Sequence, residues 1–110
     1  PVRWHEPFGL AVIESLYFGC PVFATPYGAL PELVPADCGR LSAQADELVD
    51  AIQTQKFDRQ ACHTRAVEHF SAQRMARDYL QKYQQVLDGE FLNPAQPAIQ
   101  GEARQLPWTA

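Results

Sequence analysis

The sequence of 110 residues has few basic side chains and no long apolar run, and each shortage excludes a class of protein. Its 9 lysine and arginine residues are scattered along a chain of net charge -4, without the basic stripe that a phosphate backbone requires. We therefore expect no nucleic-acid partner. No apolar run approaches the ~18 residues of a spanning helix, and no charged-then-apolar leader is visible. The sequence thus predicts neither a membrane-spanning helix nor a signal peptide.

Cysteine is also scarce. The sequence has three cysteines, an odd number: Cys20, Cys38 and Cys62. They lack the close paired spacing of a zinc site or a redox motif. We expect free thiols in a reducing compartment such as the cytoplasm, and no bound metal. Cys20 lies just before a predicted strand, so it is the cysteine that we expect to be most buried.

The sequence does have the composition of a globular domain, with 46% apolar and 20% charged residues. A chain of this length holds one modest core, so two independent domains are not expected. Residues 1–88 carry the periodic segments. Residues 89–110 contain proline, glutamine and glycine without a period, which predicts an extended or partly disordered tail.

Periodicity predicts short strands between helices. The apolar runs at residues 21–25 and 39–42 predict two strands, the first of them buried. Helices are predicted at residues 8–19, 30–34, 46–56, 58–70 and 72–88. The alternation of helices and strands indicates parallel strands joined by helical crossovers, which is an α/β arrangement.

Two of these helices have an apolar face. Leu48, Val49 and Ile52 mark the face of the helix at 46–56. Tyr79 and Tyr83 share the apolar face of the last helix, where helical spacing predicts core positions rather than ligand contacts. In a fragment, any part of this face that stayed exposed would favour a partner, so we expect that a homodimer can form.

The most informative stretch is residues 6–14 (EPFGLAVIE), in which two carboxylates flank a predicted helix start. A helix rises about 1.5 Å per residue, so Glu14 is expected roughly 9 Å along the axis from Phe8. The unpaired N–H groups at Phe8, Gly9 and Leu10, with the positive end of the helix dipole, can bind a diphosphate without a metal ion. Glu6 and Glu14 would then offer acceptors to sugar and ribose hydroxyls on either side, so the stretch suits a nucleotide-sugar.

Residues 6–14 resemble the E-x7-E motif, in its E-P-F-G-L-x-x-x-E form, of glycosyltransferase family 4 (group 1) and related retaining GT-B enzymes. The likeness continues at residues 19–22 (GCPV), 28–32 (GALPE) and 38–41 (CGRL), and covers residues 1–88. Ala29 stands where the family usually has a second glycine. If that position needed a positive φ, the alanine would be strained. The resemblance implies a partial Rossmann-like unit from a GT-B C-terminal domain, with short parallel strands flanked by helices.

The resemblance also implies roles for these residues. The parent protein would be a hexosyltransferase that moves a hexose from a nucleotide-diphosphate sugar to an unknown acceptor, by a retaining, metal-independent route without a further cofactor. Glu6 would be the catalytic residue, contacting the donor sugar and acting through binding and transition-state electrostatics. The amides of Phe8, Gly9 and Leu10 would meet the sugar and phosphates, and Glu14 would hold the ribose.

The chain begins at Pro1 directly ahead of this motif, so we expect a segment of a longer protein. Its partners would be the nucleotide-sugar donor and the upstream and N-terminal domains, which in the family hold a basic pair that clamps the diphosphate and most of the acceptor site. We expect the segment alone to be inactive, and the whole protein to be cytoplasmic or membrane-peripheral through those domains. Two alternatives stay open: a non-catalytic helical interaction module, and a fragment of another GT-B-fold enzyme such as a phosphorylase or epimerase.

Overall fold

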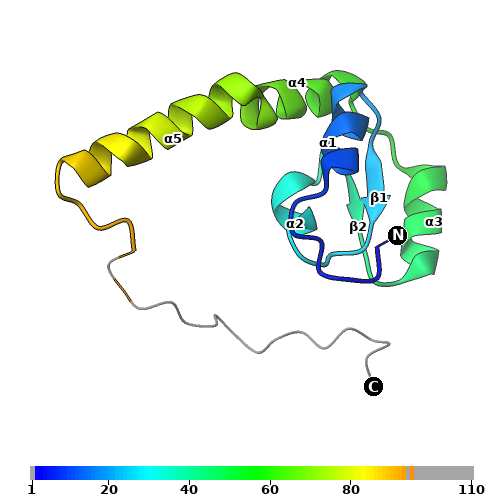
Figure 1. Ribbon diagram of the computed structural model, residues 1–110. Coiled ribbons are helices and arrows are strands. Elements are labelled where there is room, and N and C mark those ends of the chain that lie inside the picture. Colours follow the sequence, from blue (N-terminus) through cyan, green and yellow to red (C-terminus); the bar gives the residue numbers. More distant parts are fainter. Residues whose placement is uncertain (1, 94, 96–110) are drawn as a thin grey trace. The chain divides into compact units, whose positions relative to one another are not determined.

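The computed structural model describes residues 2–93 and 95, and the chain divides into two compact units, residues 1–71 and 72–110. In chain order, the first unit contains α1 (Leu10–Tyr17), β1 (Val22–Ala24), α2 (Leu30–Leu33), β2 (Gly39–Leu41), α3 (Ala45–Thr54) and α4 (Arg59–Phe70) (Figure 1). The second unit contains α5 (Ala72–Leu87). The predicted alternation of helices and strands is confirmed.

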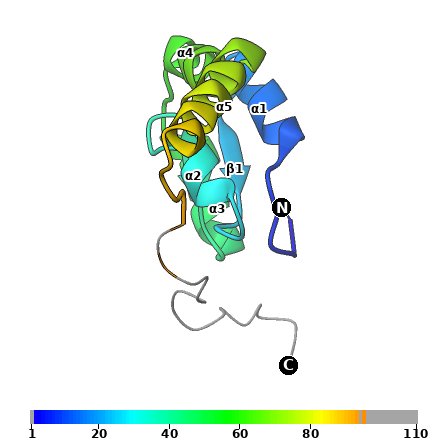
Figure 2. The same ribbon diagram turned by 60° about the vertical axis from the view of Figure 1, so that its left-hand side comes forward.

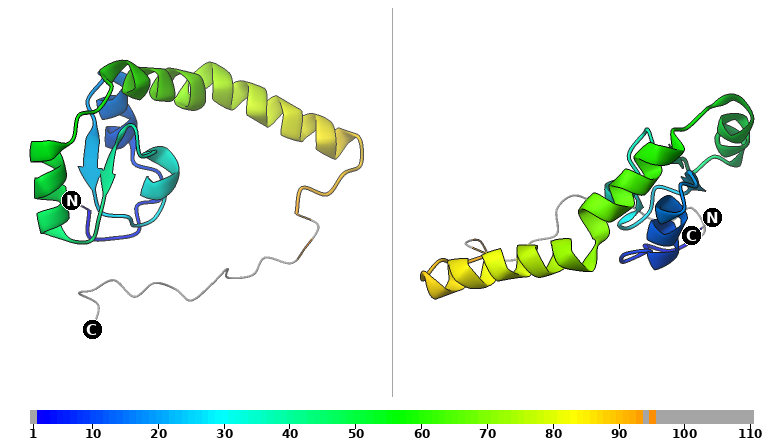
Figure 3. Two further views of the ribbon diagram at one scale, coloured as in Figure 1. Left: turned by 180° about the vertical axis from the view of Figure 1, so that it is seen from behind. Right: turned by 90° about the horizontal axis from the view of Figure 1, so that it is seen from above.

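The two strands form a parallel sheet. Val22 lies opposite Gly39, and Ala24 lies opposite Leu41. Parallel strands need a crossover between them, and the segment that contains α2 supplies it. The sheet stands between α2 and α3, and α3 packs on both strands (Figure 3). Helix α1 also packs on β1 and lies alongside it (Figure 2). The molecule is thus α/β, as the sequence predicts for a partial Rossmann-like unit.

The core of the first unit consists of two groups of buried side chains. One contains Leu16, Cys38, Cys62 and Ala66, and the other contains Ala24, Leu30, Leu33 and Val34. Three half-buried side chains, Val12, Ile13 and Val22, pack against both groups. The two groups are therefore joined through α1 and β1, and the position of α1 depends on both.

The first helix begins at Leu10, two residues later than the predicted start at residue 8. Gly9, its N-cap residue, has φ 92° and ψ 63°, a left-handed conformation that cannot continue a right-handed helix. The N–H of Phe8 consequently lies ahead of the helix, so the helix N-terminus is formed by later amides than the sequence indicated.

The buried face of α3 also differs from the prediction. Leu48 and Ala51 are buried, whereas Val49 and Ile52 are 51% and 59% exposed. A sheet of only two strands covers a narrow stripe of the helix, centred between Leu48 and Ala51. The broader face predicted from Leu48, Val49 and Ile52 is therefore wrong for the two outer residues.

The cysteine prediction is wrong in its order of burial. Cys20 is exposed, whereas Cys38 and Cys62 are buried free thiols. A Cβ at Gly19 would lie 3.0 Å from the carbonyl oxygen of Arg59, so the chain turns tightly over the start of α4 at this point. Because Gly19 faces α4, Cys20 follows it on the outside of the turn.

In the second unit, α5 buries none of its residues within the described part of the chain. Tyr79 and Tyr83 have ring centroids 6.1 Å apart and stay 57% and 59% exposed. Their predicted core position is wrong here, because the described residues of this unit include no second helix or strand for them to pack on. The predicted tail at 89–110 lies largely outside the described residues. Within those residues, none of the helices has the length and apolar character to span a bilayer.

Candidate functional site

The loop before α1 carries the predicted site residues and is fixed to the turn after β1. The hydroxyl of Thr25 donates a hydrogen bond to the carbonyl of Val2 over 2.6 Å, and the N–H of Ala29 donates to the carbonyl of Glu6 over 2.7 Å. A Cβ at Gly28, where φ is 64°, would lie 2.2 Å from that Glu6 oxygen. Only glycine allows this approach. Ala29 itself has φ −75°, so the strain considered for this position does not arise.

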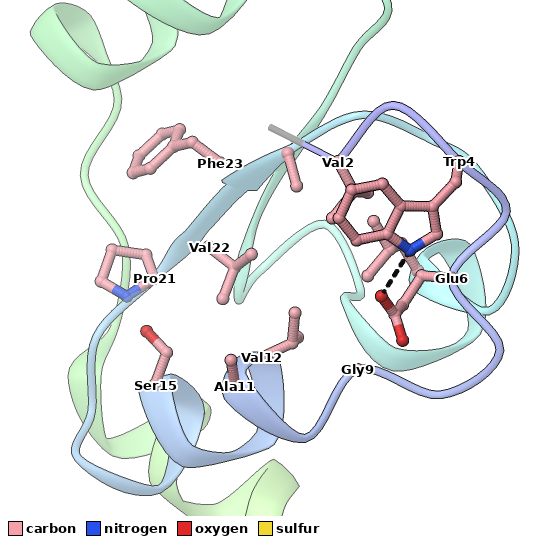
Figure 4. A pocket seen from close by; sticks show the side chains of 12 residues that line it. Val2, Trp4, Glu6, Gly9, Ala11, Val12, Ser15, Pro21, Val22 and Phe23 are labelled. Atoms are coloured by element: carbon pink, nitrogen blue, oxygen red, sulfur yellow. Dashed lines mark hydrogen bonds between the residues drawn. The ribbon is translucent and has the colours of Figure 1, made fainter.

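Beside this anchored loop lies a cavity of about 470 Å³ between α1 and β1. Its lining consists of Val2, Trp4, Glu6, Gly9, Ala11, Val12, Ser15, Pro21, Val22, Phe23, Ala24 and Leu30. Among these described lining residues, Glu6 alone carries a charge. Figure 4 shows Trp4, Glu6 and Gly9 at one end and Ser15 and Pro21 at the other. The cavity therefore has a charged end and a largely apolar remainder.

At the charged end, the Glu6 side chain is half-buried and hydrogen-bonded. The indole Nε1–H of Trp4 donates to Oε2 of Glu6 over 3.0 Å (Figure 4). The two residues are two positions apart, and the chain bends at Trp4. The carboxylate is thus held beside the start of α1 with one oxygen engaged.

The start of α1 presents backbone donors at the same end. The carbonyl of Gly9 accepts from the N–H of Val12 over 3.0 Å and from that of Ile13 over 3.4 Å. By helix geometry, the N–H groups of Leu10 and Ala11 have no carbonyl partner within the helix. These donors and the helix dipole make this end suitable for an anionic group, while the Glu6 carboxylate accepts hydrogen bonds from hydroxyls.

The apolar remainder of the cavity follows an edge of β1 that is not paired among the described residues. Val22 N–H donates to Cys38, and the Ala24 carbonyl accepts from Ser42, so both residues bond toward β2. Successive strand residues direct their backbone groups to opposite edges, so the N–H and C=O of Phe23 point away from β2. This part of the cavity is a sheet edge, and the chemistry lies at the other end.

The structure brings some of the predicted site residues together. Glu6 and Gly9 line the cavity, whereas Phe8, Leu10 and Glu14 are exposed and do not. Phe8 instead packs edge-on against Phe70, with ring centroids 6.2 Å apart. The binding role of each of these residues stays a prediction. No group of three or more His, Cys, Asp or Glu side chains within the described ranges could hold a metal ion.

Sequence reasoning missed two residues of this end. Trp4 donates to the Glu6 carboxylate, and Thr25 holds the loop through Val2. The i, i+2 spacing of Trp4 and Glu6 gave no signal by itself, because the contact depends on how the loop bends at Trp4. Thr25 had no signal either, because its partner lies 23 residues away in the sequence.

Part of this sequence is similar to known proteins. The family described as glycosyl transferases group 1 matches residues 1–68. A GDP-mannose-dependent alpha-(1-6)-phosphatidylinositol dimannoside mannosyltransferase of Mycobacterium tuberculosis (strain ATCC 25177 / H37Ra) is 36% identical over 81 residues, which cover 69% of this chain. The protein of the same description from strain CDC 1551 / Oshkosh is equally similar. The chain spans 21% of the length of these relatives.

Proposed function

Because the chain belongs to the group 1 glycosyl transferases, we propose that the charged end of its cavity binds the sugar and diphosphate of a nucleotide-sugar donor. The observation that carries this proposal is the meeting of the Glu6 carboxylate with the N-terminus of α1 in one cavity. A carboxylate accepts from sugar hydroxyls, and helix N–H groups donate to phosphate oxygens. The chain would be the donor-binding part of a hexosyltransferase, not the whole enzyme.

In this proposal the phosphates meet the free N–H groups of Leu10 and Ala11, and the hexose extends toward Glu6. The departure of the nucleoside diphosphate leaves positive charge on the sugar ring, which a fixed carboxylate nearby stabilises. Glu6 therefore acts in a retaining transfer through binding and electrostatics. The helix N-terminus carries the role that a metal ion has in other phosphate sites, so the route is metal-independent.

Glu14 lies outside the cavity but remains near it along α1. It is exposed, about 6 Å along the helix axis from Leu10. A nucleotide whose diphosphate sits at the start of α1 can direct its ribose along the outer side of the helix, where the Glu14 carboxylate accepts from ribose hydroxyls. The donor would then span from Glu6 to Glu14, as the resemblance implies.

The charge of the site predicts weak binding by this chain alone. The described cavity lining contains no lysine or arginine to offset the two phosphates. The missing cationic groups would belong to other domains of the whole protein, which would also hold the acceptor and any membrane contact. We therefore expect donor binding without transfer from the chain. GDP-mannose is the first donor to test, since a relative at 36% identity is described as GDP-mannose-dependent.

Saturation-transfer NMR tests the proposal directly. GDP, UDP and ADP, and their mannose or glucose conjugates, would be added to the chain and to its Glu14→Ala variant. We expect saturation transfer to the ribose protons of the nucleotide, and Glu14→Ala should abolish it. Glu68→Ala, which removes an exposed carboxylate on α4, is the matched control and should leave the transfer intact. An absence of transfer from every nucleotide would contradict the proposal and favour a non-catalytic interaction module.

A further inference from the structure

The side chain of Glu6 has one restraint that the motif does not include. Its backbone is held by the N–H of Ala29, but that bond leaves the side-chain torsions of Glu6 free. The hydrogen bond from Trp4 Nε1 to Oε2, at 3.0 Å, is the contact that restrains the carboxylate itself. We propose that Trp4 is a positioning residue, which orients the Glu6 carboxylate toward the donor sugar; this inference rests on the proposed role of Glu6.

The chemistry of the pair supports orientation rather than simple packing. An indole N–H only donates, so it pairs with the carboxylate and cannot accept from a sugar hydroxyl in its place. With Oε2 engaged by the indole, Oε1 is left to accept from a sugar hydroxyl. Both side chains line the same end of the cavity, so the restraint acts where the ligand is expected.

The exposure of Trp4 determines when the restraint matters most. The residue is 57% exposed, so water competes for the indole N–H in the free protein. A ligand that occupies the cavity beside the ring removes this water, and a hydrogen bond is stronger where the surroundings are less polar. Trp4 should therefore raise the affinity for ligands that place a sugar at Glu6, and should not change the affinity for ligands without a sugar.

The affinities for GDP-mannose, which carries a sugar, and for GDP, which does not, test this expectation. The sequence contains two tryptophans, so a Trp108→Phe background leaves Trp4 as the single indole. In that background, Trp4→Phe keeps an aromatic ring and removes the donor. We expect it to weaken GDP-mannose binding about fivefold, which corresponds to ~1 kcal/mol, and to leave the affinity for GDP unchanged.

The indole signal in a ¹⁵N–¹H spectrum of the same background provides a second readout. Glu6→Ala should shift this signal in the free protein, and GDP-mannose should shift it in the parent. Equal GDP-mannose affinity with and without the indole, or equal losses for both ligands, would overturn the inference while leaving the proposed function intact. An indole signal insensitive to Glu6→Ala would do the same. A parent chain that binds neither ligand would overturn the proposed function and this inference with it.

Discussion

At the scale of single residues, Gly28 shows how a backbone contact positions the site. A Cβ there would lie 2.2 Å from the Glu6 carbonyl oxygen and 2.4 Å from the Glu6 nitrogen, in addition to the strain of φ 64°. We expect Gly28→Ala to lower the free energy of unfolding by about 3 kcal/mol, measured by urea denaturation.

Gly9→Ala is the matched control for Gly28→Ala. Gly9 has φ 92° in the loop that Gly28 contacts, but a Cβ at Gly9 meets its nearest neighbour at an ordinary 3.4 Å. This change should lower the free energy of unfolding by only about 1 kcal/mol, from backbone strain alone. Equal losses from the two variants would mean that the close approach of the two segments at Gly28 is not tight in solution.

The three cysteines differ in reactivity according to burial. Burial raises the pKa of the Cys38 thiol from 9.0 to about 12, with further contributions from Cys62 and the Asp37 carboxylate. Burial raises the pKa of Cys62 as well. At pH 8 we expect Cys20 alone to react rapidly with Ellman's reagent, and the other two only after unfolding. Cys20→Ser should abolish the rapid phase; rapid reaction of two thiols in the folded chain would contradict the buried positions.

The same pKa shift predicts how stability depends on pH. A raised thiol pKa means that the folded state holds its proton more tightly than the unfolded state does. The contribution of Cys38 is therefore complete below about pH 9 and is lost as the pH rises toward 12. Urea midpoints measured between pH 8 and 10.5 should fall at the alkaline end, and the fall should be smaller in Cys38→Ala than in the parent chain.

At the scale of elements, α4 has a defined beginning. Asp58 is its N-cap residue, and Oδ1 accepts from the N–H of Gln60 over 2.8 Å. Asp58→Ala should lower the free energy of unfolding by about 1 kcal/mol, whereas Asp58→Asn keeps an acceptor and should cost less than half of that. Thermal denaturation followed by circular dichroism compares the two. An equal loss from both would mean that the side-chain charge, and not the hydrogen bond, stabilises the helix.

The packing of α1 on the core is tested by two leucines of the same helix. Leu16 is 0% exposed between Cys38, Cys62 and Ala66, while Leu10 is 69% exposed. Leu16→Ala should lower the free energy of unfolding by about 3 kcal/mol through the cavity it leaves, and Leu10→Ala by less than about 0.5 kcal/mol. Urea denaturation of both variants measures the difference, and similar losses would place α1 differently on the core.

The elements were largely predictable, whereas the start of α1 and the full buried face of α3 were not. Apolar runs and capping residues located every strand and helix of the described chain, because these signals act within a few residues. The left-handed conformation of Gly9, the exposure of Ile52 and the outward position of Cys20 depend on contacts with segments distant in the sequence. In the site, the motif indicated Glu6 and Gly9, while the partnership of Trp4 with Glu6 needed the path of the loop.

At the scale of the whole molecule, the chain spans 21% of the length of its curated relatives. Two of its surfaces have no packing partner among the described residues. The edge of β1 that carries Phe23 is unpaired among the described residues, and α5 buries no residue among them. Composition and periodicity predicted apolar residues in β1 and α5. They carry no information on which segments pack against these residues. The same proportion explains why we expect binding of a donor rather than transfer from it.

The most direct test of the proposed site is to map where GDP-mannose binds, using amide shifts in ¹⁵N–¹H spectra of the whole chain. The cavity predicts the largest shifts at Gly9, Leu10 and Ala11, with a smaller one at Glu14 and none near Glu68 on α4. Glu6→Ala should weaken these shifts, and in the free protein it should change only signals near residue 6, including the Trp4 indole. Shifts confined to other segments, or unchanged binding in Glu6→Ala, would contradict a donor site at the start of α1.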